Sequence, residues 1–118
     1  MAAKDDLGRH GEELAAAYLT DRGYRIVDRN WRCPQGEIDL VARHGRHTAF
    51  VEVKTRSSVA YGHPFEAITH AKLGRLYRLA RLWCRDHPGR HGELRVDVVA
   101  IVAPRDGQPV VELFEDVR

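Results

Sequence analysis

Acidic residues and one lysine occur in two neighbouring segments of this 118-residue chain, at spacings that could build a metal site. The first segment carries Glu37 and Asp39, and the second carries Glu52 and Lys54. Side chains alternate across a β-strand, so the two residues of each pair share a face if both segments are strands. On adjacent strands the three carboxylates and the ammonium group would converge. Carboxylates that close raise one another's pKa unless a cation lies among them, and hard divalent ions such as Mg²⁺ take oxygen ligands.

A hairpin with one solvated face also alternates charged residues and valine without any function. The neighbouring residues argue against that interpretation. Asp39 is flanked by Ile38 and Leu40, which we expect on the other face of the strand. Glu52 lies within the apolar run 50–53. Acids in such buried segments are uncommon unless they are paired or bind a metal, so the pattern favours a cation site.

Apolar periodicity and turn residues predict an α/β fold in the order α-β-β-β-α-β-β, with a mixed sheet flanked by helices. Helices are predicted over 5–22 and 65–86. Strands are predicted over 24–31, 37–43, 48–55, 95–102 and 110–114. A short polar link joins the second strand to the third, which predicts a hairpin that brings the candidate acids together.

Composition is that of an ordinary soluble domain, with 43% hydrophobic and 31% charged residues. The length predicts one domain over residues 1–118. No apolar run is long enough to span a membrane, and the first residues lack the order of a signal peptide, so we expect a cytoplasmic protein without a membrane partner. Cys33 and Cys84 have no neighbouring ligand, which speaks against zinc or a disulfide framework.

The net charge of +2 does not by itself indicate nucleic-acid binding, but basic residues concentrate between His70 and His91, where six Lys or Arg accompany one acid. A helical wheel places four arginines opposite the apolar stripe, namely Arg75, Arg78, Arg81 and Arg85. These form either a solvated helix face or a stripe that follows a DNA backbone. Arg56 and Lys72 are better placed to contact a phosphate beside the acids.

The spacing of Asp39, twelve further residues and then Glu52-Val-Lys54 resembles the PD-(D/E)XK nuclease signature, with Ile38 where proline is usual. Longer stretches are similar to the bacterial YraN family, whose small members are classed as endonucleases by their motif and fold. They include Gly8-Arg-His-Gly-Glu12, Gly36-Glu-Ile-Asp-Leu40, Phe50-Val-Glu-Val-Lys-Thr-Arg56, Tyr61-Gly62 and Arg95-Val-Asp-Val-Val99. The resemblance covers essentially the whole chain and implies a restriction-endonuclease-like sheet, similar to that of archaeal Holliday-junction resolvases.

The resemblance implies that Glu12, Asp39 and Glu52 are acidic ligands of Mg²⁺ or Mn²⁺, and that Lys54 is the catalytic lysine. The wheel favours Glu12 over Glu13, because Glu12 lies on the flank of the apolar stripe. The backbone carbonyl of Val53 is a further candidate ligand. Glu37 is either an outer acid of the site or a solvated strand start.

The expected activity is metal-dependent hydrolysis of DNA phosphodiester bonds, with branched or structured DNA as the partner. Arg56, Lys72, Arg75 and Arg78 are the candidate nucleic-acid contacts. The resolvase resemblance also suggests a homodimer with two sites. The alternative is a non-catalytic module that binds nucleic acid or protein and keeps the nuclease fold.

Overall fold

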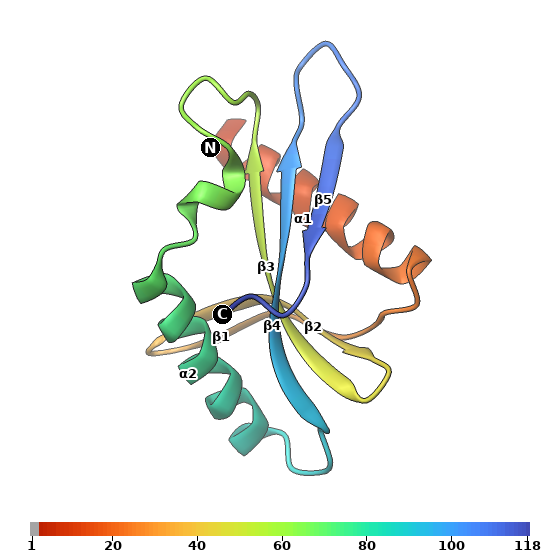
Figure 1. Ribbon diagram of the computed structural model, residues 1–118, viewed down its shortest axis with the longest axis vertical. Helices are drawn as coiled ribbons and strands as arrows, with labels where there is room; N and C mark the ends of the chain where they lie inside the picture. The colour runs from red at the N-terminus through yellow and green to blue at the C-terminus, as the bar shows by residue number, and fades with distance from the viewer. Residues whose placement is uncertain (1–2) are drawn as a thin grey trace.

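Five strands and two α-helices follow one another along residues 3–118 of the computed structural model, in the predicted order (Figure 1). The elements are α1 Ala3–Asp21, β1 Arg25–Cys33, β2 Gly36–His44, β3 His47–Arg56, the 3-10 turn η1 Pro64–Ala67, α2 His70–Asp86, β4 Glu93–Val102 and β5 Val110–Phe114. The predicted α/β class is confirmed. No helix among these residues combines the length and apolar character needed to cross a membrane.

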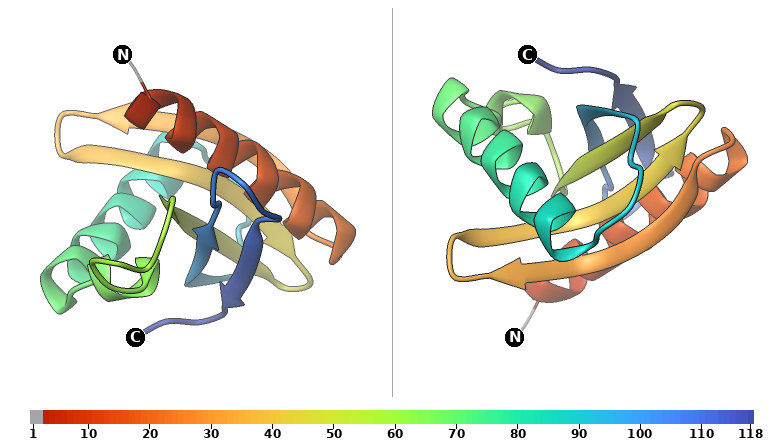
Figure 2. Two further views of the ribbon diagram at one scale, coloured as in Figure 1. Left: turned by 90° about the horizontal axis from the view of Figure 1, so that it is seen from above. Right: turned by 90° about the horizontal axis from the view of Figure 1, so that it is seen from below.

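The sheet places its strands in chain order, β1-β2-β3-β4-β5. Strands β3 and β4 pair in parallel, and the other neighbours pair antiparallel. A parallel pair needs a crossover, and α2 supplies it between β3 and β4. Strand β3 is therefore central, with a neighbour on each side and a helix over each face (Figure 2).

Successive residues of β3 are buried on opposite faces of the sheet. Val51 belongs to the core cluster that contains Leu19 of α1. Phe50 belongs to the cluster that contains Leu79 and Trp83 of α2. Because both faces of the central strand are covered, Glu52 is buried, while Lys54 nearer the end of the strand is half-buried.

The second helix begins later than predicted. The pattern over 65–86 is divided into the short turn η1 and α2, which starts at His70. Ile68 is extended, and the Thr69 hydroxyl accepts a hydrogen bond from the backbone N–H of Lys72 at 3.1 Å. This cap satisfies an N–H that has no partner inside the helix, so a new helix starts there. The cap also fixes Lys72 on the first turn of α2.

Helix α1 approaches β3 closely at Gly11. A Cβ atom built on Gly11 would lie 1.8 Å from Oγ1 of Thr55, so even a methyl group does not fit against the Thr55 side chain. The contact explains why glycine interrupts the apolar stripe of α1. It also brings the next residue, Glu12, towards the strand that carries Glu52.

Gly11→Ala is therefore expected to destabilise the fold by about 1–3 kcal/mol, the range for overpacking a tight contact. Gly8→Ala is the matched control, because nothing lies within 4 Å of a Cβ at Gly8 and alanine favours helix. Urea unfolding followed by circular dichroism measures both. Equal stability of the two variants would contradict the close contact.

Alternation of side chains is interrupted in the middle of the β1–β2 hairpin. The pairs on either side place Asn30 opposite Asp39. Asn30 has a φ of 51°, a left-handed conformation that asparagine tolerates better than most residues. Ile38 then packs in the α2 cluster, and Leu40 packs in the α1 cluster. The expectation that Ile38 and Leu40 share a face is wrong, because the two side chains pack against different helices, and the change of side occurs at Asp39, opposite the left-handed Asn30.

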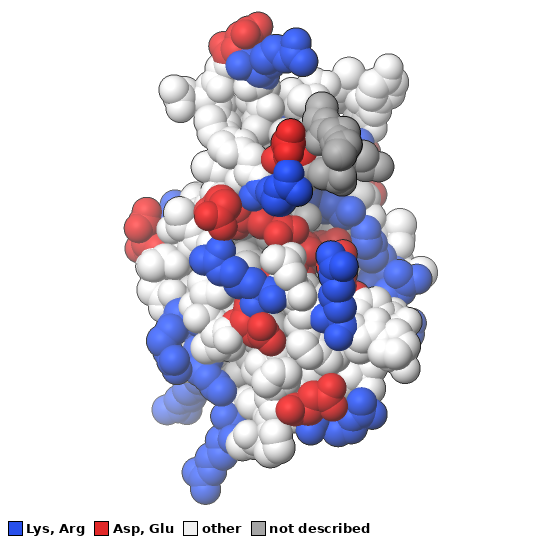
Figure 3. Space-filling view, turned by 180° about the vertical axis from the view of Figure 1, so that it is seen from behind, with Lys and Arg blue, Asp and Glu red and all other residues white. Residues whose placement is uncertain are grey.

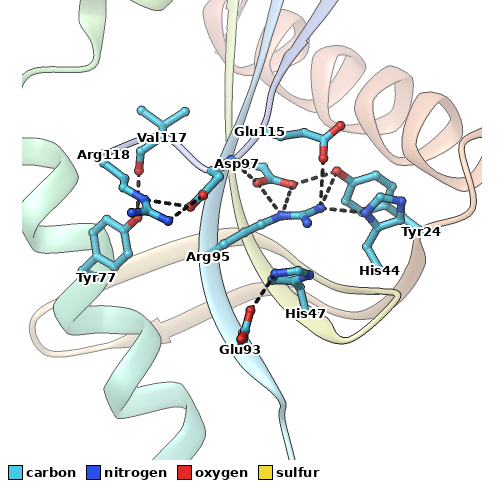
Figure 4. A network of polar contacts seen from close by, with 11 residues as sticks. Tyr24, His44, His47, Tyr77, Glu93, Arg95, Asp97, Glu115, Val117 and Arg118 are labelled. Atoms are coloured by element: carbon cyan, nitrogen blue, oxygen red, sulfur yellow. Dashed lines mark hydrogen bonds and ion pairs between the residues drawn. The ribbon is translucent and has the colours of Figure 1, made fainter.

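Two buried charges, Arg95 and Asp97, lie in β4, whose other residues over 96–102 are apolar (Figure 4). Arg95 donates to Asp97 at 2.9 Å, and the Tyr24 hydroxyl donates to the same carboxylate at 2.8 Å. Arg95 also contacts His44 at 2.7 Å, and the Asp116 N–H donates to Asp97 at 2.9 Å. Burial of these charges is tolerated because each is paired. The network ties the C-terminal segment and the start of β1 to the sheet.

Candidate active site

Asp39 lies where β2 stops pairing with β3. The last ladder pair is Leu40 with Val51. Beyond it, the Asp39 carboxylate accepts a hydrogen bond from the backbone N–H of Val53 at 2.8 Å. A side chain thus bridges the strands where the backbone ladder ends, and this bridge holds the carboxylate at the surface of the sheet.

Burial and neighbouring acids raise the pKa of Asp39 to about 8. Burial is the largest cause, followed by the negative charge of Glu52, and Glu12 adds to the repulsion. The hydrogen bond from Val53 opposes these effects, because it stabilises the carboxylate. Asp39 and Glu52 are therefore close enough to repel each other, as the sequence predicted.

Glu52 is buried on β3 and is 8% exposed. Two lysines approach one of its carboxylate oxygens, Oε2. The Nζ atom of Lys54 lies 3.9 Å from it, and that of Lys72 lies 3.6 Å from it. Lys54 comes from the same strand and Lys72 from the first turn of α2, so strand and helix both contribute cations to this acid.

The two lysines also affect each other. A hydrogen bond with Lys72 is the largest cause that lowers the pKa of Lys54, and burial and the charge of Lys72 lower it further. Glu52 and Asp39 act in the opposite direction. The site thus holds charges of both signs at short range, with Glu52 buried between two half-buried lysines.

These groups line one cavity of about 380 Å³ between α2 and the sheet. Its polar lining combines three acids with three bases, and its apolar wall belongs to α2. The lining residues are Gly36, Glu37, Asp39, Glu52, Val53, Lys54, Lys72, Arg75, Leu76 and Leu79. The predicted convergence of the β2 and β3 side chains is present, and Glu37 is part of it while forming an ion pair with Arg32 at 3.1 Å.

Glu12 lies in a smaller pocket of about 190 Å³, whose lining includes Asn30 and Leu40. Burial raises its pKa most, the charges of Glu37 and Glu52 raise it further, and a hydrogen bond from Asn30 lowers it. Its charge therefore acts on the acids of the larger cavity, although the Glu12 side chain does not line that cavity.

The donor chemistry of Asp39 and Glu52 fits Mg²⁺ or Mn²⁺. Within the part of the chain that the structure describes, no three His, Cys, Asp or Glu side chains converge as a complete metal cage. Mg²⁺ does not need such a cage, because it keeps several waters and binds proteins through one or two carboxylates. The repulsion that raises the pKa of Asp39 is what a cation between these carboxylates would remove.

The candidate nucleic-acid contacts separate into three positions. Lys72 and Arg75 line the cavity with the acids. Arg78 lines an adjacent groove. Arg56, the last residue of β3, is half-buried and is not among the residues that line either.

Sequence reasoning missed two features of the site. It treated Lys72 as a phosphate contact and did not predict its ion pair with Glu52, which depends on the Thr69 cap. It also gave no role to Asn30, although asparagine is one of the few residue types enriched at positive φ.

The face opposite to that of Figure 1 carries charges of both signs (Figure 3). Acidic side chains gather across its middle, with Lys and Arg side chains around them. On this face the Lys and Arg side chains are interspersed with acidic ones and do not form one continuous basic surface.

A family model described as "Uncharacterised protein family UPF0102" matches residues 11–101. This span runs from Gly11 of α1 to Ile101 of β4 and includes the whole cavity lining.

Similar proteins carry the same description. The UPF0102 protein of Arthrobacter sp. (strain FB24) is 63% identical over 112 residues, 95% of each chain. That of Clavibacter michiganensis subsp. michiganensis (strain NCPPB 382) is 58% identical over 113 residues, 96% of each chain. That of Nocardia farcinica (strain IFM 10152) is 50% identical over 109 residues, 92% of this chain and 86% of the relative.

Proposed function

This chain belongs to the UPF0102 family, which is the YraN family, and on that premise we propose that it is a divalent-metal-dependent endonuclease that hydrolyses DNA phosphodiester bonds. One observation carries the proposal. Asp39, Glu52 and Lys54 line a single cavity at the end of the β2–β3 ladder, and Asp39 and Glu52 repel each other there.

Asp39 and Glu52, with the Val53 carbonyl, would hold Mg²⁺ or Mn²⁺. Glu12, whose charge acts on Asp39, would assist them. A divalent cation bound there would supply positive charge to the scissile phosphate and lower the pKa of the attacking water. The hydrogen bond from the Val53 N–H fixes Asp39, so the carboxylate is already oriented before substrate arrives.

The lysines act on the phosphate side of the reaction. Lys54 orients the attacking water or stabilises the negative charge that develops on the phosphate. Lys72 balances the charge of Glu52, and with Arg75 it holds a phosphate at the mouth of the cavity. A compact ammonium group suits Lys54, because its role needs a point charge rather than a bidentate fork.

A panel of branched, nicked, duplex and single-stranded DNA tests the proposal, with Mg²⁺ or Mn²⁺ in one series and EDTA in the other. Cleavage that requires the metal and is absent from an Asp39→Asn preparation purified in parallel supports it. The parallel preparation controls for contaminating nucleases. Binding of DNA without cleavage of any substrate in the panel would instead favour the non-catalytic binding module. The substrate cleaved fastest would identify the preferred DNA structure.

Gel filtration coupled to light scattering would test the expected homodimer.

A further inference from the structure

A groove of about 490 Å³ lies beside the candidate active site. One wall is α2, and the other includes the turn between β1 and β2. The lining residues are Gln35, Arg75, Arg78, Leu79, Arg81 and Leu82. The helical wheel alone placed these arginines opposite the core, but the β1–β2 turn encloses three of them within a groove.

The groove and the active-site cavity are neighbours along α2. Arg75 and Leu79 line both. A polymer bound in the groove would therefore continue into the cavity that holds Asp39 and Glu52.

The chemistry of the groove matches a nucleotide chain. Its lining has three guanidinium groups and no carboxylate, so it attracts anions. The half-buried Leu82, with the buried Leu79 beneath it, provides an apolar floor, and the amide of Gln35 offers both a donor and an acceptor. Guanidinium groups suit phosphates, an apolar floor suits the face of a base, and an amide suits the edge of a base.

We propose that this groove binds an unpaired DNA strand next to the scissile phosphate, with phosphates on Arg75, Arg78 and Arg81 and a base on the floor formed by Leu79 and Leu82. The proposal rests on the proposed nuclease function, because the strand is placed by its continuity with the cavity. It adds the substrate class, which is DNA with an unpaired segment at the cleavage site.

An unpaired strand fits better than a duplex because a duplex turns its bases inwards and presents phosphates and sugars to a concave surface. The Leu79 and Leu82 floor would then gain no partner. An acidic peptide would satisfy the arginines, but its carboxylates would not use an apolar floor beside an amide as a base does.

Fluorescence anisotropy in EDTA tests binding without cleavage. The probes are a labelled oligothymidylate of about 15 nucleotides and a hairpin duplex with the same number of phosphates. The wild type is expected to prefer the oligothymidylate. The Arg78→Gln/Arg81→Gln variant should bind it about tenfold more weakly or worse, and should lower the slope of log K against log salt by about 1.4, the value for two phosphate contacts of a single strand.

The control variant is Arg46→Gln/Arg105→Gln, which removes the same charge. Both residues are exposed, and neither lines the groove or the active-site cavity. Its affinity for the oligothymidylate should stay close to that of the wild type. An equal loss in both double variants would overturn the groove and leave only general charge attraction.

Leu82→Ala tests the floor separately. Leu82 is half-buried, so thermal melts first establish that the variant is folded. The affinity for the oligothymidylate should fall while the salt slope stays unchanged, since no phosphate contact is lost. Unchanged affinity of Leu82→Ala would overturn the proposed base contact. So would a wild type that binds the duplex as tightly as the oligothymidylate, or polyglutamate that competes as well as unlabelled oligothymidylate.

The binding assays contain no metal, so they are independent of cleavage. If the variants lose affinity as expected but the wild type cleaves no DNA, only the nuclease function is contradicted.

Discussion

Replacing Asp39 by asparagine is expected to abolish metal-dependent cleavage of DNA while the protein stays folded. Asparagine keeps an oxygen that can accept the hydrogen bond from the Val53 N–H, but it removes the charge that would hold the cation. Glu52→Gln should have the same effect. Cleavage of the preferred DNA with Mg²⁺ measures both variants. Glu13→Gln is the matched control, because Glu13 is exposed on the same helix as Glu12 and pairs with Arg29 outside the cavity.

Asp39→Asn should also be more stable than the wild type when no metal is present. The pKa of Asp39 is raised from 3.8 to about 8 in the folded protein, so the folded chain holds this proton more tightly than the unfolded chain does. The wild type therefore loses stability as the pH rises through that interval, and Asp39→Asn avoids this loss.

Thermal melts in EDTA between pH 5 and pH 8 measure the difference, which should widen towards pH 8. Addition of Mg²⁺ should then raise the melting temperature of the wild type more than that of either variant. Equal cleavage by wild type and variants, or an equal effect of Mg²⁺ on all melting temperatures, would show that the acids do not form a metal site.

The sheet and the position of the acids on it were predictable because they depend on local patterns. Alternation placed Glu52 and Lys54 on one face of β3, and the short β2–β3 link made the hairpin. The helical wheel distinguished Glu12 from Glu13, and the structure places the former half-buried and the latter exposed. Such features repeat within a single element, so a few residues suffice to reveal them.

The parts of the site that were not predictable depend on contacts between elements. The ion pair of Lys72 with Glu52 needs the start of α2 at Thr69, and the 65–86 pattern hid that start because η1 and α2 are both rich in apolar residues. Similarly, α2 alone cannot show that Arg78 and Arg81 line a groove, because Gln35 forms part of the other wall from a distant turn. The network of Arg95 and Asp97 was overlooked because, apart from each other, their partners lie in other segments.

Lys54→Ala is expected to separate DNA binding from chemistry. If Lys54 acts on the attacking water or on the developing charge, the single-turnover rate should fall about 100-fold or more while the affinity for DNA falls only modestly. Lys54→Arg should restore little activity, because a larger planar guanidinium does not reproduce a compact ammonium group beside Glu52.

Lys72→Ala is the comparison that gives this result its meaning. Both lysines contact the same oxygen of Glu52, so both variants remove one cation from the same acid. Lys72 comes from α2 and is assigned to charge balance and phosphate contact, so its loss should weaken DNA binding more and the single-turnover rate less. Rapid-quench measurements at saturating enzyme, combined with anisotropy in EDTA, give the rate and the affinity separately. If the two variants lose rate and affinity in the same proportions, Lys54 is a phosphate contact like Lys72, and the catalytic role passes to the acids alone.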